Sequence, residues 1–456
     1  MKSKSILFGL ALLGSMLATS VVQAASEAVG WDALPQILAK IKAPEFPDRS
    51  FDVTDFGAKE GGEVLCTEAI KEVIAACVKA GGGKVVVPAG RFLTGPIHLQ
   101  SNVNLVVSKG TTLVFSDNPE HYLPAVLVRW EGEECYNLSP LIYANGCENI
   151  AITGEGTLDG QGPKWWEWRE REGDPYRVAN NIKMGWAREG MPVEERVMGE
   201  GDMRWCPTFI SPINCKNVLI EGLTLIDGPF WNVQPVYCEN VTIRGLEIIN
   251  DGPNGDGCNP SSCKYVLIED CVFKTGDDCI AIKSGKNEDG RRVGRASEYI
   301  VIRNCVMKDG HGGVVIGSEM SGDVRNVYAE DCVMDSPNLD RALRIKTNSE
   351  RGGVVENVYM RNVEVGQVGQ AVLKINFFYS DVDVGDHTPS VRNINLENVT
   401  CEKSDYGIWI KGYERSPITG VTLINCSFNN VEKGNVLEGV TDLELRRVTI
   451  NGERVH

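Results

Sequence analysis

The sequence predicts an all-β solenoid, a single-stranded parallel β-helix whose short strands stack coil upon coil behind an N-terminal capping helix. Three observations support this class. An apolar motif recurs ten times, five of the nine steps from one copy to the next have lengths in the twenties, and apolar residues alternate with polar ones within each copy. Because a repeat this short has no room for a crossover helix, stacked coils whose equivalent positions form ladders are the expected architecture.

The repeating motif is roughly Asn-Val-x-Ile-x-x-Val/Cys-x-Val/Ile. Its copies begin at Ile150, Val218, Val241, Val266, Ile300, Val327, Val358, Ile394, Val421 and Leu443. An asparagine that we expect to stack in a turn precedes six strands, at Asn149, Asn217, Asn240, Asn326, Asn357 and Asn393. A longer step, such as the one from Val266 to Ile300, is expected to be the same coil with a longer loop. A β-propeller is the structural alternative, but its blades need about 40 residues.

The cysteines share positions in the repeat with aliphatic residues. One such position is occupied by Cys271, Cys305, Cys332 and Cys426, and by leucine or valine in sister copies. Cysteine that exchanges with leucine and valine behaves as a small core hydrophobe. The total of fifteen is also odd, so at least one cysteine has no intramolecular partner. We therefore expect few or no disulfides, although the chain reads as an exported protein.

The N-terminus has the pattern of a secretory signal peptide. Lys2 and Lys4 precede an apolar run from Ile6 to Ala18, and small residues follow up to Ala24. The apolar run is too short for a membrane span. We expect residues 1–24 to be removed and the mature protein to be exported to the periplasm or the medium, without a membrane partner.

The rest of the chain reads as a polar linker, 25–50, followed by one β-helix domain, 51–456. A helix is expected from Thr67, as a plausible N-cap, to Lys79, because its apolar residues recur with helical spacing. A Trp-rich insertion at about 160–208 interrupts the repeat. Long insertions in solenoids tend to gather on the binding face, so its aromatic residues either stack on sugar rings or pack the insertion against the coils.

The net charge of −16 excludes one broad class of partner. Nucleic acid needs clustered basic residues, and this chain has an acidic excess. If its ligand is itself an acid, the site must contain a local group of cations. We expect a monomer that does not bind nucleic acid.

Three carboxylates stand in two glycine-flanked segments of the chain. Asp277 and Asp278 follow Asp256 by the length of one short repeat, so we expect them on neighbouring coils. An isolated Asp-Gly is typical of a turn. A set of carboxylates beside apolar strands costs free energy unless the charges are paired, solvated or used. Paired carboxylates are what acid and base hydrolysis of a glycosidic bond requires.

Further polar residues recur at a nearly constant interval, as expected for one per coil. His311 follows Asp277, Arg344 follows His311, and Tyr379 follows Arg344, in steps of almost equal length. This spacing predicts a single column of functional side chains down one face. Arg344 and Lys346, two apart on an expected strand, point to the same side. They supply the local positive charge that an anionic sugar needs.

These segments carry a resemblance to a known family. Four motifs, in this order and spacing, resemble those of the polygalacturonases of glycoside hydrolase family 28: Asn254-Gly-Asp256, Gly276-Asp-Asp-Cys279, Gly310-His-Gly312 and Arg344-Ile-Lys346. The resemblance implies a right-handed β-helix that hydrolyses α-1,4 bonds between galacturonates with inversion and without metal or another cofactor. The first motif departs from the family in having Gly255 where threonine is usual.

The resemblance also implies a role for each residue. Asp277 would be the general acid, Asp256 and Asp278 would activate the attacking water, and His311 would support the protonation state of the site. The substrate would be held by Arg344, Lys346, Asn254 and Tyr379. For inversion the two carboxyl groups should lie about 6.5–9.5 Å apart. Three crowded carboxylates should also raise at least one pKa.

Other interpretations remain open. A calcium-dependent pectate lyase could share the fold and substrate, with Asp381, Asp383 and Asp386 as a candidate cluster for the ion. A hydrolase of rhamnogalacturonan or xylogalacturonan could share fold and site. A non-catalytic carbohydrate-binding β-helix has no reason to keep these acids together. The sequence leaves exo and endo action open, although a wall built by the insertion would favour release of short products.

Overall fold

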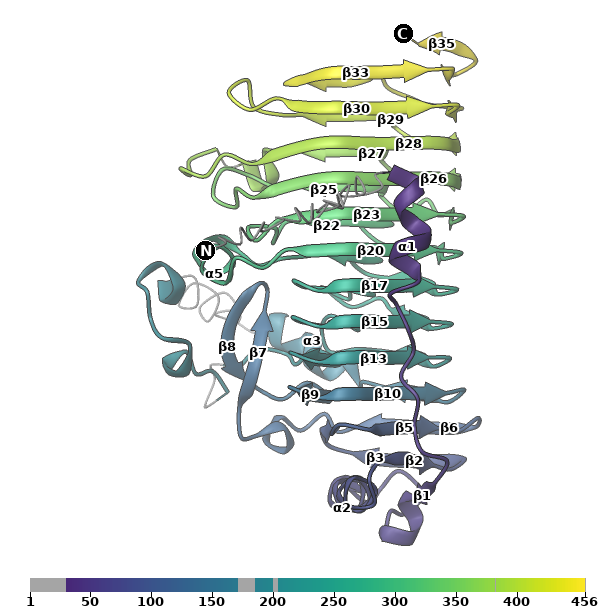
Figure 1. Cartoon of the computed structure of the whole chain (residues 1–456), viewed down its shortest axis with the longest axis vertical. Helices are drawn as coiled ribbons and strands as arrows, with labels where there is room; N and C mark the ends of the chain where they lie inside the picture. Colours follow the sequence, from purple (N-terminus) through teal and green to yellow (C-terminus); the bar gives the residue numbers. More distant parts are fainter. Residues whose placement is uncertain (1–29, 171–184, 200–203, 382, 456) are drawn as a thin grey trace, which may run out of the picture.

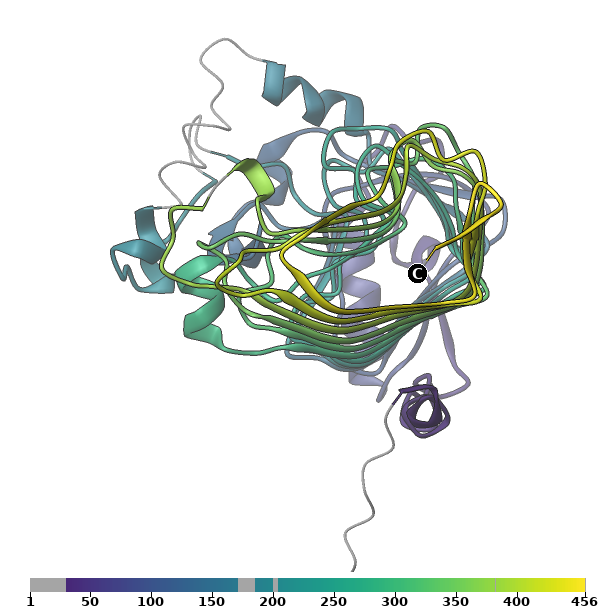
Figure 2. The same cartoon turned by 90° about the horizontal axis from the view of Figure 1, so that it is seen from above.

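A computed structural model describes residues 30–170, 185–199, 204–381 and 383–455. The predicted signal peptide, 1–24, lies outside them. The chain forms a right-handed parallel β-helix whose coils stack from the N-terminal helix to the C-terminus (Figure 1). Seen along the axis, successive coils superimpose around one continuous apolar interior (Figure 2). None of the described helices is long and apolar enough to cross a lipid bilayer.

The first face of the solenoid contains the strands that the repeat predicts. They are β1 (Ser50–Asp52), β2 (Gly83–Val87), β5 (Val103–Val107), β10 (Glu148–Gly154), β13 (Lys216–Glu221), β15 (Glu239–Arg244), β17 (Lys264–Glu269), β20 (Ser297–Arg303), β23 (Val324–Glu330), β26 (Val354–Gln367), β28 (Ser390–Lys403), β30 (Ile418–Ile424) and β33 (Val440–Arg446). The first residues of all ten motif copies pair in one unbroken register, from Ile150 with Val218 to Val421 with Leu443. The predicted register is confirmed.

The second face is built from shorter strands, and the long strands β26 and β28 bend across both faces. It contains β3 (Gly90–Thr94), β6 (Thr111–Phe115), β11 (Thr157–Asp159), β14 (Thr224–Ile226), β16 (Glu247–Asn250), β18 (Val272–Thr275), β21 (Val306–Met307), β24 (Val333–Met334), β31 (Ser427–Phe428) and β34 (Val448–Ile450), with β35 (Glu453–Val455) antiparallel to β34.

The third face contains β4 (Ile97–His98), β9 (Ile142–Asn145), β12 (Ile210–Ile213), β19 (Ile280–Ile282), β22 (Val314–Gly317), β25 (Arg341–Lys346), β27 (Ala371–Asn376), β29 (Tyr406–Lys411) and β32 (Val436–Glu438). Single bridges through Val233 and Cys258 connect β12 to β19. Apolar side chains at alternate positions fill the interior, and the remaining positions of these strands point outward. The functional residues described below lie at and just before these strands.

The helices lie outside the coils or at their end. They are α1 (Leu34–Leu38), α2 (Thr67–Lys79), α3 (Gly162–Glu170) and α5 (Asn287–Val293), with 3-10 turns η1 (Gly30–Ala33), η2 (Val53–Phe56), η3 (Pro119–Tyr122), η4 (Val193–Glu195) and η5 (Tyr379–Asp381). A hairpin of β7 (Val126–Trp130) and β8 (Glu133–Asn137) projects beside α5 (Figure 1).

The predicted capping helix has the expected bounds, with Ile70, Val73, Ile74 and Cys77 buried. Thr67 is not its N-cap. That position is Cys66, whose side chain makes no capping hydrogen bond. The Thr67 hydroxyl accepts a hydrogen bond from the backbone N–H of Gly95 (2.6 Å).

Turn residues stack between coils as the sequence indicates. Asn149, Asn217 and Asn240 all have positive φ, and each amide donates to the asparagine of the preceding coil. The left-handed backbone is one that asparagine tolerates better than most residues. At the same position Tyr265 and Tyr299 interrupt the ladder and stack on each other, with centroids 5.0 Å apart.

All fifteen cysteines are buried with free thiols. Strand register places Cys271, Cys305 and Cys332 in one column between Leu246 and Val363. The exchange of cysteine with aliphatic residues at this position is therefore an exchange within the core.

Residues 30–50, within the segment expected to be a polar linker, form part of the folded molecule. Helix α1 packs against the first face, where Trp31 meets the stacked rings of Tyr328 and Tyr359. Farther along, Lys42 and Asn240 exchange two hydrogen bonds of 2.8 Å. The segment thus runs across several coils on the outside of the solenoid (Figure 1).

Candidate active site

The candidate site lies where the turns from the second face enter the third face. Asp277 and Asp278 stand between β18 and β19, and Asp256 stands at the equivalent turn of the preceding coil, two residues before the bridge at Cys258. His311 comes three residues before β22, and Arg344 and Lys346 lie on β25. We call this region the trough.

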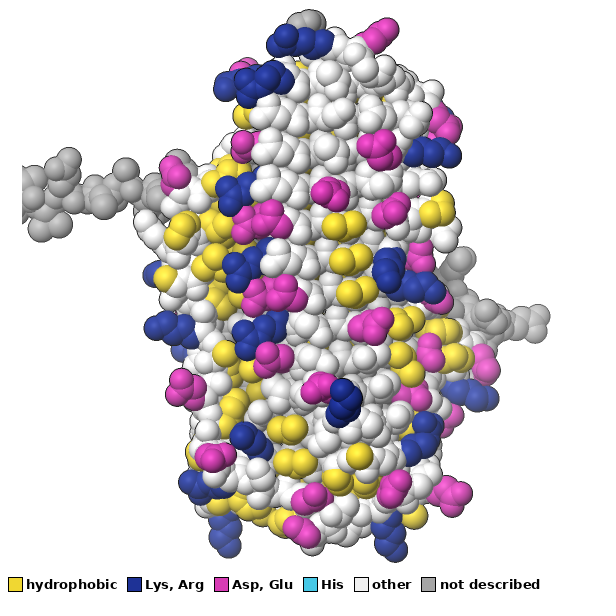
Figure 3. All heavy atoms as spheres, turned by 90° about the vertical axis from the view of Figure 1, so that its right-hand side faces the viewer, with side chains coloured by type: hydrophobic (Ala, Val, Ile, Leu, Met, Phe, Trp, Pro, Cys, Tyr) yellow, Lys and Arg dark blue, Asp and Glu magenta, His cyan; other side chains and the backbone are white. Residues whose placement is uncertain are grey.

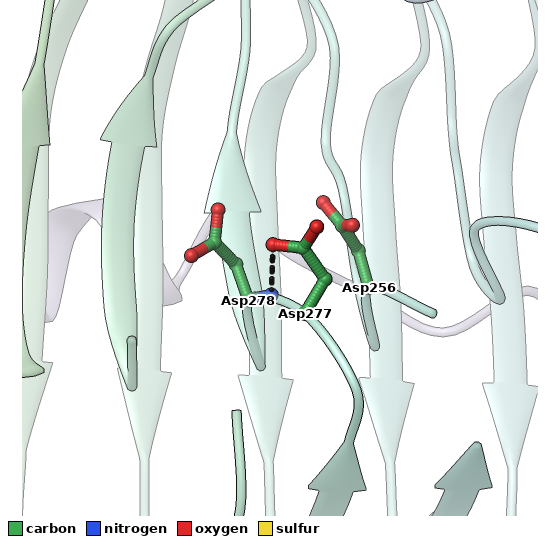
Figure 4. A group of neighbouring side chains, drawn as sticks. All are labelled: Asp256, Asp277 and Asp278. Carbon is green, nitrogen blue, oxygen red and sulfur yellow. Dashed lines mark hydrogen bonds between the residues drawn. The ribbon is translucent and has the colours of Figure 1, made fainter. Parts of the chain in front are cut away.

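The three carboxylates form one cluster. An oxygen of each lies within 4.8 Å of an oxygen of the other two, and the backbone N–H of Asp278 donates to Asp277 Oδ1 at 2.8 Å (Figure 4). Asp256 and Asp278 are buried, whereas the Asp277 side chain keeps 17% of its surface exposed. Asp277 is therefore the carboxylate most accessible to a substrate.

The closest oxygens of the three acids lie within 4.8 Å of one another, as expected for neighbouring coils. The separation of about 6.5–9.5 Å between whole carboxyl groups that inversion needs stays a prediction. Two of the acids are neighbours in the chain, and the third lies one coil away. Adjacent strands are only about 4.8 Å apart. The stacking of the coils therefore sets the close approach of these oxygens.

Cations surround the cluster. Lys346 Nζ lies 2.7 Å from Asp278 Oδ2, and Arg344 Nη1 lies 3.3 Å from Asp278 Oδ1. His311 Nδ1 lies 3.0 Å from Asp277 Oδ1. The structure thus brings the three acids, the histidine and the two cations into one trough.

The single column of functional residues is wrong in register. His311 is in line with Asp277, and its backbone N–H donates to the Asp277 carbonyl, but Arg344 pairs with Val315, four positions beyond His311. Arg344 and Lys346 instead reach back from within β25 to a cluster that lies before the strands. Coils with different loop lengths shift the sequence interval without shifting the strand register.

Two other expected substrate contacts lie nearby. The ring centroid of Tyr379 is 5.9 Å from the Arg344 guanidinium and 5.5 Å from Lys346 Nζ. Asn254 has a left-handed backbone, and Gly255 follows it. A Cβ at Gly255 would come within 2.7 Å of the Asn250 carbonyl oxygen, so this turn has no room for the threonine that is usual in the family.

Comparison with known proteins identifies the relatives of the chain. Residues 196–389 match the model of Glycosyl hydrolases family 28. A "Probable polygalacturonase" of Vitis vinifera is 30% identical, over 87% of this chain and 77% of its own. The chain belongs to glycoside hydrolase family 28.

Two solved structures of family 28 proteins resemble the whole solenoid. An exopolygalacturonase from Thermotoga maritima is 42% identical, with a TM-score of 0.89, over 92% of this chain and 96% of that one. The family 28 exopolygalacturonase of Yersinia enterocolitica is 25% identical, with a TM-score of 0.72, over 90% and 76%. These likenesses confirm the predicted fold, and family membership makes the protein a glycoside hydrolase.

Within the family 28 site, sequence reasoning missed a buried lysine. Lys283 Nζ lies 3.0 Å from Glu319 Oε2 and 3.6 Å from Asp256 Oδ2, and 4.5 Å from the centroid of Trp231. Asn259 Nδ2 donates to the same Asp256 oxygen at 2.9 Å. Strand alternation could have found Lys283, because Ile280 and Ile282 point inward and the next residue points toward the trough.

Burial and charge divide the acids of the trough. Burial, reinforced by the charge of Asp277 and opposed by that of Lys283, raises the pKa of Asp256 to about 8. Burial also tends to raise the pKa of Asp277, but the hydrogen bond to His311 and the charges of Lys346 and His311 hold it below its ordinary value. The pKa of one carboxylate, Asp256, is thus raised, as the crowding of three acids predicts.

His311 complements this arrangement. Its hydrogen bond to Asp277 outweighs burial and raises the pKa of the imidazole. The contact that holds the pKa of Asp277 below its ordinary value thus also raises the pKa of His311. Since an oxygen of each carboxylate lies within 4.8 Å of the others, one bridging water can relay a proton from Asp256 to Asp277.

The donor set of the cluster is better suited to cations of the protein than to a metal ion. Among the described residues these three acids are the group close enough to share an ion. Both oxygens of Asp278 accept from Lys346 and Arg344, and Asp277 accepts from His311. Ca²⁺ needs six to eight oxygen ligands, which this set does not offer.

The candidate calcium cluster of a lyase is also poorly supported. Asp383 forms an ion pair with Arg415 (2.9 Å to Nη1), so its charge is already matched. Among the side chains that the structure describes, this loop has no group of three acids close enough to share an ion.

Proposed function

We propose that this family 28 hydrolase cleaves α-1,4 bonds between galacturonate residues of pectin, by inverting acid and base catalysis. One observation supports this above the others: the acids that can cleave a glycosidic bond lie beside Arg344 and Lys346, in a protein of net charge −16. A neutral sugar would not need this local charge. Arginine binds a carboxylate bidentately, and lysine adds a point charge.

The proposed roles follow from exposure and contacts. Asp277 is the accessible acid, and it would donate a proton to the glycosidic oxygen after receiving one within the cluster. Asp256 and Asp278 would bind and activate the attacking water, and Lys346 and Arg344 would hold the galacturonate carboxylate. Asn254, two residues before Asp256, and Tyr379, whose ring lies beside Arg344 and Lys346, would contact the sugar. Bonds to the substrate carboxylate would also loosen the hold of the two cations on Asp278, which makes that carboxylate a better base.

We further propose that attack occurs at chain ends. The similar structures of Thermotoga maritima and Yersinia enterocolitica are exopolygalacturonases, and an exo-poly-alpha-D-galacturonosidase of Dickeya chrysanthemi is 26% identical over 89% of this chain. The tip of the β7–β8 hairpin would form a wall beside the trough. The Gly132 carbonyl accepts from Lys286 N–H at 3.0 Å, and Gly132 packs against Glu319, which pairs with Lys283 beside Asp256.

Product analysis tests the proposal. Polygalacturonate and its oligomers should yield new reducing ends and, from the first time point, a single short product. A ladder of sizes would contradict exo action. An unsaturated product that absorbs in the ultraviolet would mean a lyase, and cleavage confined to rhamnogalacturonan or xylogalacturonan would mean a related backbone. Proton NMR of the first product would show α-to-β inversion, and retention would contradict the proposed roles of Asp256 and Asp278.

Export is proposed on the sequence of residues 1–24. The mature protein should begin at Ala25 and be found outside the cytoplasm as a monomer. N-terminal sequencing and light scattering of the protein isolated from its host would check both statements.

A further inference from the structure

A row of cationic and aromatic side chains continues from Arg344 along the outer side of the third face. Arg344 on β25 pairs with Lys374 on β27, which pairs with Trp409 on β29, so each lies one coil beyond the last. Lys374 Nζ lies 4.3 Å from the Trp409 ring centroid, and Lys411 Nζ lies 5.6 Å from it. Trp409 is partly exposed. We call Lys374, Trp409 and Lys411 the platform.

Hydrogen bonds connect the platform to the trough. Gln370 Oε1 accepts from Lys374 Nζ and from Arg341 Nε, both at 2.7 Å. Arg341 Nη1 in turn donates to the His311 carbonyl at 3.0 Å. The position of Lys374 is therefore fixed relative to the catalytic cluster rather than left to a free side chain.

The cations here exceed the acids that face them. The positive charges of Arg341 and Arg344 repel that of Lys374, and Asp340 is the nearby carboxylate that attracts it. Burial and the charges of the two arginines lower the pKa of Lys374 to about 8. Lys411 is paired with Glu438 at 3.2 Å, at the far edge of the platform. Like charges held together cost free energy, which an anionic ligand would offset.

We propose that the platform is a leaving-chain subsite, which binds the galacturonate residues that follow the one held at Arg344. This inference rests on the proposed function. A sugar ring would lie on Trp409, and Lys374 would bind a carboxylate. Strands lie about 4.8 Å apart, so a polymer running along the solenoid meets Arg344, Lys374 and Trp409 in turn. In Figure 1 the β7–β8 hairpin lies beside coils below β25, whereas β27 and β29 lie above β25, which leaves this direction for the polymer.

Chain length provides the test. Trp409→Ala and Lys374→Ala should each lower kcat/KM on tetragalacturonate about tenfold, the size of one cation–π or stacking contact. The value for digalacturonate, which ends at the trough, should change less than about twofold. Trp409→Phe should retain most of the activity on tetragalacturonate. Equal losses on both substrates, or no loss on tetragalacturonate, would overturn the subsite.

The matched control is Lys433→Ala. Lys433 also forms an ion pair, with Asp405 at 2.7 Å, and lies 5.3 Å from the ring of Tyr406. It is outside the Arg344 row, because Tyr406 pairs with Ala371 rather than Lys374. This variant should match the unmodified protein on every substrate.

Binding measurements separate failure of the platform from failure of the proposed function. In the Asp277→Asn background, calorimetry should give a tetragalacturonate Kd that Trp409→Ala raises about tenfold. If the unmodified protein cleaves no galacturonate but binding still depends on Trp409, the platform stands and the proposed function fails. If cleavage occurs and Trp409 affects neither Kd nor kcat/KM, the platform fails alone. Absence of both binding and cleavage overturns both.

Discussion

Ion pairs stack from coil to coil in two regions of this solenoid, and the regions differ in burial. On the outside, arginines reach glutamates of the preceding coil in the pairs Arg244–Glu221, Arg303–Glu269 and Arg361–Glu330. Their arginine side chains keep 32–38% of their surface exposed. In the trough, the side chains of Lys283, Lys346 and Asp278 keep 9% or less.

The same stacking geometry therefore has opposite consequences. In the outer pairs water reaches the arginine and competes for it, so each pair contributes about 0–1 kcal/mol, although Glu269 and Glu330 are themselves buried. Buried pairs gain little net stability, but loss of one partner leaves an uncompensated charge. On the outer surface, basic and acidic side chains are interspersed, as on the side shown in Figure 3. A charged side chain there can change its partner at little cost in free energy. The buried side chains of the trough cannot, and this restriction is what a catalytic cluster requires.

The largest expected effect is on turnover in the trough. Asp277→Asn removes the accessible acid, and kcat should fall by about 10²–10⁴-fold while the fold persists. Release of reducing ends from polygalacturonate measures it. Asp331→Asn, at a turn where the carboxylate accepts from Asn362 at 3.0 Å, is the matched control and should keep full activity. Near-full activity of Asp277→Asn would contradict the assigned role.

The next effect is on stability. Lys283→Met leaves Glu319 and Asp256 buried without their cation, and it should cost about 3–5 kcal/mol. Thermal and urea unfolding would measure the loss. The double variant Lys283→Met with Glu319→Gln removes charge from both sides of the closer contact and should recover part of that loss. If the single variant costs no more than an outer pair, the burial argument is wrong.

The difference between the regions also explains what the sequence could predict. The register followed from alternation and repeat length, since every copy from Ile150 to Leu443 obeys the same interior packing. The acids of the trough were found because glycine-flanked Asp256, Asp277 and Asp278 are unusual beside apolar strands.

Sequence reasoning found neither the role of Lys283 in the trough nor the position of Arg344 out of line with His311. Both depend on where a side chain reaches after the strands are stacked, and loop length conceals that. The same is true of the segment before Ser50, whose Trp31 packs on Tyr328 and Tyr359 from coils in the distant second half of the chain.

The pH dependence of stability should differ between Asp256→Asn and the unmodified protein. The folded pKa of Asp256 is about 8, against 3.8 when unperturbed. The folded state thus binds more protons between these values, and stability falls as pH rises through that window. Asparagine resembles the neutral acid and avoids this loss. The variant should gain stability relative to the unmodified protein, more at pH 8 than at pH 4, by apparent melting temperature. An equal difference at both pH values would contradict the raised pKa.

An outer pair should matter much less. Arg303→Met removes a guanidinium that lies 2.6 Å from Glu269 Oε2 with its side chain 32% exposed, and the expected cost is about 0–1 kcal/mol. High salt should shrink the difference from the unmodified protein, because exposed charges are screened. Urea unfolding at low and high ionic strength would measure both. A loss as large as that of Lys283→Met would erase the distinction between the two regions.

The smallest effect is expected inside the coils. Cys305 is buried in a column whose other members include Cys271, Cys332 and Val363, so Cys305→Val changes shape and volume little and should cost less than about 1.5 kcal/mol. Cys305→Asp at the same site would bury an unpaired charge and should unfold the chain or cost several kcal/mol. Urea unfolding of the two variants compares them directly. The thiol makes weak hydrogen bonds to the carbonyls of Arg303 (3.3 Å) and Ile268 (3.8 Å), which valine cannot reproduce. A large loss for valine would mean that these contacts give the thiol a role beyond filling space.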